Sequence, residues 1–176
     1  MARPRTKSDD ELLDATLRVI EREGVGGLTL AGVASEAGIA ASSLHARFGG
    51  KRALLLAAAA RLEPPRARDD LAPDDAIEEL LVRSVASMAD RETWLNQFSW
   101  LQLDLHDEEF GVEAQRYVLA LRDELARLLC AAGRDAALAP AVYAAQQGAL
   151  MLWALDRDGE LPGRVRDAVR AVLRDP

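Results

Sequence analysis

The stretch VASEAGIAASSLHARFGGK, from Val33 to Lys51, restricts the possible folds more than any other part of the sequence. Two short helices joined by a tight turn need a small residue where they cross, a residue that tolerates a left-handed backbone, and an apolar anchor on the second helix. Ala34, Gly38 and Leu44 have these properties at the required spacing. The stretch therefore predicts a helix-turn-helix, although the alanine and glycine spacing alone would also suit any small helical hairpin.

Helical patterns continue on both sides of this stretch. Ser8 and Glu11 predict a capping box, and apolar residues then recur with helical period until Gly24. The two prolines at 64 and 65 end the helical pattern of the first part. We predict four helices there, at residues 9–23, 30–37, 40–47 and 51–62.

The downstream sequence is also helical in pattern. Apolar residues make up 49% of the chain and are mostly Ala, Leu and Val, while aromatic residues make up 5%, which favours helices over strands. The polar, proline-rich segment at 63–73 predicts a boundary between two domains, residues 1–62 and 63–176. We expect an all-α fold of about nine helices, the last five at residues 74–89, 93–106, 108–132, 140–155 and 162–173.

Several functional classes find no support in the sequence. Cys130 is the only cysteine and His45 and His106 are the only histidines, so neither an internal disulfide nor a structural zinc cluster is expected. No motif combines a nucleophile, a base and an orienting group, and no phosphate loop is present, so we expect no enzyme activity and no cofactor. The basic start of the chain lacks the apolar segment of a secretory signal, and we expect a cytoplasmic location.

The helix-turn-helix is part of a longer signature, LLDATLRVIEREGVGGLTLAGVASEAGIAASSLHARFGGKRALLLAA. This signature resembles the amino-terminal domain of the TetR family of bacterial transcription regulators. The resemblance implies a helix-turn-helix head that binds double-stranded operator DNA, and a C-terminal domain that dimerises and binds a small-molecule effector. Binding of the effector would release the DNA.

The resemblance also implies which residues contact DNA. Residues 41–43 would face the major groove, Thr29 would lie near a phosphate, and His45 takes the place of a tyrosine that commonly contacts phosphate. The second helix differs from the family pattern because it begins Ala40-Ala41, which provides neither an N-cap side chain nor a base-reading side chain. The implied DNA-binding residues are Thr29, Ala41, Ser42, Ser43, His45, Arg47 and Lys51.

The charge of the chain is unevenly distributed along the sequence. Residues 1–62 contain nine Lys or Arg and seven Asp or Glu, for a net charge of +2, whereas residues 63–176 contain thirteen and twenty-two, for −9. We therefore expect the DNA-binding head to be the less acidic part. Its expected contacts with the DNA backbone come from Arg3, Arg5, Lys7, Arg47, Lys51 and Arg52.

The region TWLNQFSWLQLDLHDEEF, together with a tyrosine further on, carries the candidate effector site. Its aromatic residues suit either a packed core or the wall of a ligand cavity, and Ser99, Gln102 and His106 fall on one stripe that could orient a ligand. The acids around His106 also suit a metal site, but Asp107 as a helix N-cap explains them more simply, and we expect no metal. The candidate ligand-binding residues are Trp94, Phe98, Trp100, Gln102, His106 and Tyr117.

The last two predicted helices are candidates for a homodimer contact. The uncharged run from Ala136 to Leu155 is long enough for a membrane span, but Pro140 and Gln146 favour a buried or interface helix, and we expect no membrane partner. Small residues along 140–155 would let another helix approach closely, and residues 162–173 are strongly amphipathic. Packing of both helices within one subunit is the alternative.

These observations favour a ligand-responsive DNA-binding regulator, a repressor released from a palindromic operator by a small apolar or aromatic molecule. The alternative is a helical protein-interaction module of the same fold that has lost specific operator binding.

Overall fold

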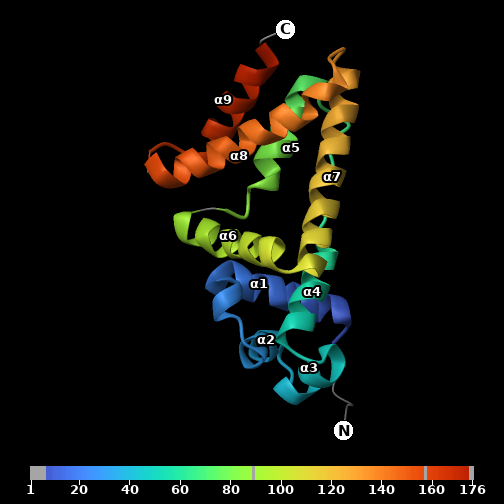
Figure 1. Cartoon of the computed structure of the whole chain (residues 1–176), viewed down its shortest axis with the longest axis vertical. Coiled ribbons are helices and arrows are strands. Elements are labelled where there is room, and N and C mark those ends of the chain that lie inside the picture. Colours follow the sequence, from blue (N-terminus) through green and yellow to red (C-terminus); the bar gives the residue numbers. More distant parts are fainter. Residues whose placement is uncertain (1–6, 89, 157, 175–176) are drawn as a thin grey trace. The chain divides into compact units, whose positions relative to one another are not determined.

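The computed structural model describes residues 7–88, 90–156 and 158–174 (Figure 1). Within these ranges the chain forms nine α-helices and one short 3-10 helix, with no strand. The prediction of an all-α fold with about nine helices is confirmed. The helices form two compact units.

The first unit combines the described residues up to Leu62 with residues 90–114. The helix α6 therefore belongs to this unit and packs along α1, although its sequence lies beyond the proline-rich segment. The unit contains α1 (Asp9–Gly27), α2 (Leu30–Ala37), α3 (Ala41–Phe48), α4 (Lys51–Arg61), α6 (Arg91–His106) and the beginning of α7 (Glu108–Ala131).

Local signals fix the start and the bend of α1. The Ser8 hydroxyl accepts a hydrogen bond from the Glu11 amide, and the Glu11 carboxylate accepts one from the Ser8 amide, which confirms the predicted capping box. Gly24 interrupts the helix with φ 69° and ψ 171°, a backbone conformation that residues other than glycine rarely adopt. The chain then makes one more turn to Gly27, so α1 extends beyond the predicted end at residue 23.

The core of the first unit is made of aliphatic side chains from α1 to α4, closed by two aromatic side chains from α6 and α7. Leu12, Val19, Leu44 and Leu54 have no exposed surface, and Phe110 is 1% exposed. Burial of such side chains contributes about 1.5–3 kcal/mol each. The helix-turn-helix is thus built on a core that also includes residues of α6 and α7.

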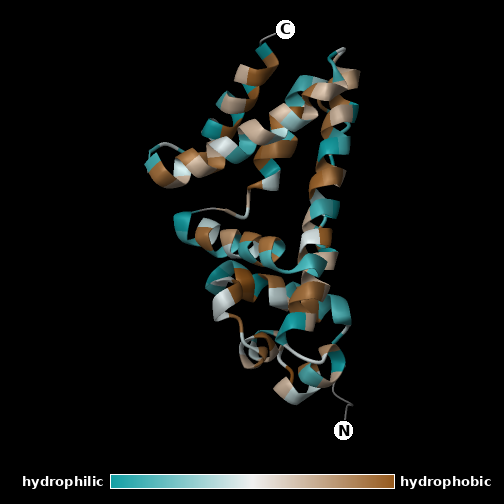
Figure 2. Cartoon of the chain, viewed as in Figure 1, coloured by the Kyte–Doolittle hydropathy of each residue, from teal (hydrophilic) through white to brown (hydrophobic). Residues whose placement is uncertain are grey.

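The second unit contains the remaining helices, of which α8 packs along α9 and α9 packs on α5. Polar and apolar positions alternate along α9 with helical period (Figure 2). Val165, Val169 and Leu173 are buried, and the neighbouring exposed residue Arg170 forms an ion pair with Glu78 of α5. The unit comprises α5 (Pro73–Ser84), the rest of α7, the 3-10 helix η1 (Ala136–Leu138), α8 (Ala139–Asp156) and α9 (Leu161–Arg174).

A buried polar contact joins α5 and α8. Gln146 is 1% exposed, and its amide nitrogen donates to the Leu81 carbonyl at 2.9 Å and to the Ser84 hydroxyl at 2.5 Å. These bonds satisfy a polar side chain that lies among the mostly apolar residues of α8. None of the helices in the described ranges has the length and apolar character needed to cross a membrane.

The helix α5 ends earlier than predicted, at Ser84 rather than residue 89. The Ser84 hydroxyl donates to the Leu81 carbonyl, and Val85 leaves the helical conformation with φ −113° and ψ 8°. A side chain that hydrogen-bonds to the backbone of the preceding turn competes with the helical hydrogen-bond pattern, which is consistent with the end of the helix at Ser84.

Candidate functional site

The turn between α2 and α3 has the geometry that the sequence predicts. Gly38 adopts the left-handed conformation, with φ 70° and ψ 37°, and the Ile39 amide donates to the Ala34 carbonyl at 2.9 Å. Ala34 is 2% exposed and Leu44 is fully buried. A small residue at the crossing and an apolar anchor on the second helix thus hold α3 in a fixed orientation on the core of the first unit.

The anchoring of α3 leaves its other side exposed. Ala41, Ser42, Ser43, His45 and Arg47 are all exposed on this one helix. The structure therefore brings together the five predicted DNA-binding residues of α3. The N-cap residue Ala40 provides no side-chain hydrogen bond, as its sequence predicts. The free backbone N–H groups of an uncapped helix N-terminus can donate to a phosphate oxygen.

Two further predicted DNA-binding residues lie at the starts of α2 and α4. The Thr29 hydroxyl is the N-cap of α2 and accepts a hydrogen bond from the Gly32 amide at 3.0 Å, which leaves its own proton available for donation. The Lys51 ammonium donates to the Gly26 carbonyl at 3.2 Å. That partner is neutral, so the positive charge of Lys51 is not compensated by this contact.

Other basic residues of the head contact acidic groups of the same unit. Lys7 is paired with Glu11 at 3.0 Å, and Arg47 is paired with Asp9 at 3.3 Å. Arg52 is paired with two carboxylates of the α6–α7 region. Arg3 and Arg5 lie outside the described residues.

The grouping of helices also changes the charge of the head. Residues 90–114 contain one Arg and seven Asp or Glu, so residues 1–62 and 90–114 together contain ten basic and fourteen acidic residues, for a net charge of −4. The compact unit that carries α3 is therefore acidic, unlike residues 1–62 alone. Any attraction of the basic residues on α3 and α4 for a DNA phosphate must therefore act at short range, because the net charge of their own unit is negative.

The predicted effector residues of α6 lie on three different sides of that helix. Trp94 and Phe98 stack with their ring centroids 5.1 Å apart and are half-buried. Leu101 and Leu105 follow on the same side at helical spacing and are 41% and 73% exposed. We call these four residues the outer stripe of α6.

Trp100 lies on the opposite side of α6 and belongs to the core. It is 9% exposed, and its ring centroid is 6.3 Å from that of Phe110. For this residue the structure agrees with the packed-core alternative.

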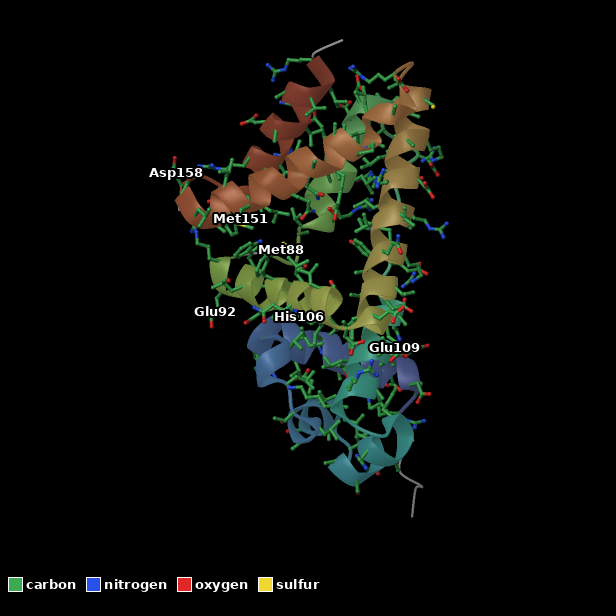
Figure 3. The ribbon with its side chains drawn as sticks, viewed as in Figure 1. Met88, Glu92, His106, Glu109, Met151 and Asp158 are labelled. Carbon is green, nitrogen blue, oxygen red and sulfur yellow. The ribbon has the colours of Figure 1, made fainter. Side chains whose placement is uncertain are left out.

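Gln102 and His106 lie on a third side of α6, along an open groove of about 730 Å³ in the first unit. The groove is also lined by Val25, Lys51 and Leu55 from the head. Figure 3 shows His106 at the end of α6, where its Nδ1 lies 2.7 Å from the Gln102 carbonyl oxygen.

Tyr117 belongs to the second unit, on α7. Burial raises the pKa of its phenol above the ordinary value, with a further contribution from Tyr143. Within the first unit, the predicted set therefore divides into the stacked pair, the core tryptophan and the groove residues.

Two polar residues of α6 connect it to the bend of α1. The Asn96 amide nitrogen donates to the carbonyls of Glu21 and Arg22, each at 3.0 Å. The Ser99 hydroxyl accepts a hydrogen bond from the Val25 amide at 2.9 Å. Sequence reasoning placed Ser99 on a ligand stripe and did not identify Asn96, because a polar residue within an apolar pattern does not reveal which distant backbone it will cap.

Acidic residues of α6 and its junction with α7 have separate roles. Asp104 is half-buried, and desolvation raises the pKa of its carboxyl to about 6. The Asp107 carboxylate accepts a hydrogen bond from the Glu109 amide at 3.2 Å, consistent with its predicted capping of α7. In the part of the chain that is described, no group of three or more His, Cys, Asp or Glu side chains could hold a metal ion.

Comparison with known proteins agrees with this geometry. Residues 12–58 match the family of bacterial regulatory proteins described as the tetR family. The chain is 34% identical over 106 residues to the HTH-type nicotine-responsive transcriptional repressor HdnoR of Paenarthrobacter nicotinovorans. The matched region covers 60% of this chain and 54% of that repressor, so it spans about half of the relative's length.

Solved structures of the same fold cover nearly the whole chain. The multidrug binding protein EbrR, crystallised with proflavin, has a TM-score of 0.65 at 20% identity and covers 93% of this chain and 98% of its own. A TetR transcription regulator from Haloarcula marismortui has a TM-score of 0.71 at 16% identity, covering 93% of this chain and 95% of its own. The helix-turn-helix geometry, the match over residues 12–58 and the shared fold together support a regulator of the tetR family.

Proposed function

We propose that this chain is a DNA-binding transcriptional repressor that a small apolar or aromatic molecule releases from a palindromic operator. The observation that carries the proposal is the exposed side of α3, fixed on the buried Leu44 by the left-handed turn at Gly38. A rigidly held short helix with exposed polar side chains suits insertion into the major groove.

The exposed residues of α3 suggest how DNA is bound. Ser42 and Ser43 have short hydroxyl side chains that accept or donate to several bases, so they provide limited base discrimination. His45 and Arg47 lie on the same helix and Lys51 begins the next one, at positions suited to backbone phosphates. Most of the affinity should therefore come from phosphate contacts, which are sensitive to salt.

The outer stripe of α6 is the best candidate surface for the effector. It combines the stacked pair Trp94 and Phe98 with the exposed side chains of Leu101 and Leu105. Half-buried aromatic and exposed aliphatic side chains of this kind gain from contact with a flat apolar ligand. The complex of EbrR with proflavin supports an aromatic effector class. Gln102 and His106, on another side of α6, and Tyr117, in the second unit, stay separate predictions that this surface does not include.

A homodimer through the exposed side of α8 completes the proposal. Gly148 is exposed, and Met151, Leu152 and Leu155 on this helix are 41%, 54% and 69% exposed. The apolar side of α9 is buried within its own unit, so α9 would contribute its charged side to the dimer contact. A two-fold symmetric dimer would bind a palindromic site whose half-sites lie about one helical turn apart, or a multiple of it.

Selection from a pool of random DNA duplexes tests the proposal. The full chain should enrich a palindromic sequence, and the enrichment should weaken when Ser42 and Ser43 are both replaced by alanine. Proflavin, added as a probe, should quench the tryptophan fluorescence and reduce binding to the enriched duplex. Recovery of a pool with no common sequence would contradict operator binding and favour the protein-interaction module.

A further inference from the structure

Arg52, in the first turn of α4, is held by two carboxylates from the junction of α6 and α7. Its Nε and Nη2 donate to the two carboxylate oxygens of Asp107, each at 2.9 Å, and Nη2 also donates to Glu109 at 2.5 Å. These hydrogen bonds, the one from Glu109 first, raise the pKa of Arg52 above its ordinary value. We call these three residues the acidic clamp.

The helix junction fixes the position of both carboxylates. Asp107 follows the last residue of α6, and its amide donates to the Leu103 carbonyl at 2.9 Å while its carboxylate accepts from the Glu109 amide. Phe110 is 1% exposed, and the Arg52 guanidinium lies 5.8 Å from the centroid of its ring. The clamp therefore rests on the core of the first unit rather than on two freely moving surface side chains.

The clamp has a net charge of −1, because one guanidinium faces two carboxylates. The side chains of Arg52, Asp107 and Glu109 are 55%, 28% and 61% exposed. Ion pairs this exposed contribute little net stability, so their partners can be exchanged. A DNA phosphate is tetrahedral, but its two non-bridging oxygens can accept a bidentate pair of hydrogen bonds from Arg52, as a carboxylate does.

We propose that the acidic clamp withholds Arg52 from DNA, and that the position of the α6–α7 junction sets whether Arg52 is available to a backbone phosphate. The inference rests on the proposed DNA binding. Arg52 directly follows Lys51, the predicted phosphate contact, and α4 follows α3 after two glycines. The arrangement described here, with Arg52 paired to Asp107 and Glu109, is then the state of lower DNA affinity. Displacement of the junction from α4 releases one positive charge at the head.

Neutralising the two carboxylates tests the clamp directly. In the full chain, Asp107→Asn with Glu109→Gln keeps the side-chain sizes, and asparagine retains the capping oxygen for α7. Binding to a fluorescent random-sequence duplex of about 30 base pairs, roughly three helical turns, is measured across a series of salt concentrations. The double variant should bind more tightly at low salt, on the order of tenfold, with a log–log slope steeper by about 0.9 for each additional phosphate that the protein neutralises.

Two further variants separate the clamp from a general charge effect. The charge control, Glu92→Gln with Glu108→Gln, removes the same amount of charge from two exposed residues of the same unit that are not part of the clamp. Figure 3 shows the control residue Glu92 at the start of α6 and the clamp residue Glu109 at the start of α7. Arg52→Gln is combined with the clamp variant in a double-mutant cycle. The gain in affinity should exceed that of the charge control and should disappear when Arg52 is absent.

Each outcome distinguishes the clamp from the function on which it rests. An equal gain in affinity with and without Arg52, or an equal gain from the charge control, would overturn the clamp while leaving DNA binding intact. Glu109→Gln alone, at an exposed position, should give part of the gain and guards against misfolding of the double variant. If neither the parent nor any variant binds duplex DNA at low salt, the proposed function itself is contradicted.

Discussion

Replacing Asn96 by aspartate should loosen the contact between α6 and the bend of α1. The substitution keeps the size of the side chain and nearly its helix propensity, but it exchanges an amide donor for a carboxylate that only accepts hydrogen bonds. Both bonds to the Glu21 and Arg22 carbonyls, each 3.0 Å long, are then lost. The new negative charge would also face the negative end of the α1 dipole.

The expected loss follows from these two hydrogen bonds. Each hydrogen bond contributes about 0.5–1.5 kcal/mol net, and one of the two lies in an exposed position where water can replace it. Repulsion between the new carboxylate and the two carbonyl oxygens offsets the stabilisation that a hydrogen bond from water would restore. We therefore expect the free energy of unfolding of the first unit to fall by about 2 kcal/mol.

Urea unfolding followed by tryptophan fluorescence measures this change. The chain has three tryptophans, and a Trp153→Phe background leaves only Trp94 and Trp100, both on α6 in the first unit. Gln97→Glu is the matched control, because it makes the same amide-to-acid change on the neighbouring residue of α6, which is also half-buried. The control should cost less than about 0.5 kcal/mol. Equal losses from the two substitutions would refute the view that Asn96 holds α6 on α1.

Two further substitutions test the dimer contact and the buried carboxyl. Gly148→Arg should convert dimers into monomers by light scattering without harming the subunit, because a Cβ at Gly148 would meet nothing within 4 Å; an unchanged dimer mass would place the contact elsewhere. Asp104→Asn should be stabilising at neutral pH, because burial raises the pKa of the Asp104 carboxyl from 3.8 to about 6. The contribution of Asp104 is fully present below pH 3.8 and is lost as the pH rises through about 6, so the advantage of the variant in thermal unfolding should grow over that interval. Parallel pH profiles of parent and variant would contradict the assignment.

The parts of the structure that depend on residues close together in the sequence were predictable. Ser8 with Glu11 and Ala34 with Gly38 act within one helix or one turn, so their spacing alone determines the local geometry. The partner of α6 was not predictable in this way, because helical periodicity shows that a side is apolar but not which helix covers it. The sequence therefore grouped α6 with the downstream helices, whereas hydrogen bonds between residues 74 or 75 positions apart, such as that of Asn96 with Glu21, place it on α1.

For the same reason, the sequence does not show which aromatic residues of α6 are buried in the core. Trp94 and Phe98 lie four residues apart on α6, and the structure stacks their rings. The distinction between that pair and Trp100 depends on the core formed with Phe110, which lies on the next helix. The pairing of Arg52 with Asp107 likewise joins residues separated by 55 positions, and no local pattern in the sequence indicates it.

The salt dependence of DNA binding by the parent and by Lys51→Ala tests the central claim most directly. The duplex selected by the full chain and a random duplex are titrated in parallel over a range of salt concentrations. If the exposed side of α3 and the start of α4 bind DNA, affinity should fall linearly with salt on a log–log plot. Lys51→Ala should weaken binding to both duplexes equally and reduce the magnitude of the slope by about 0.9 for each phosphate that is no longer neutralised. A flat salt dependence, or a Lys51→Ala protein that binds both duplexes like the parent, would contradict the assignment of this surface to DNA.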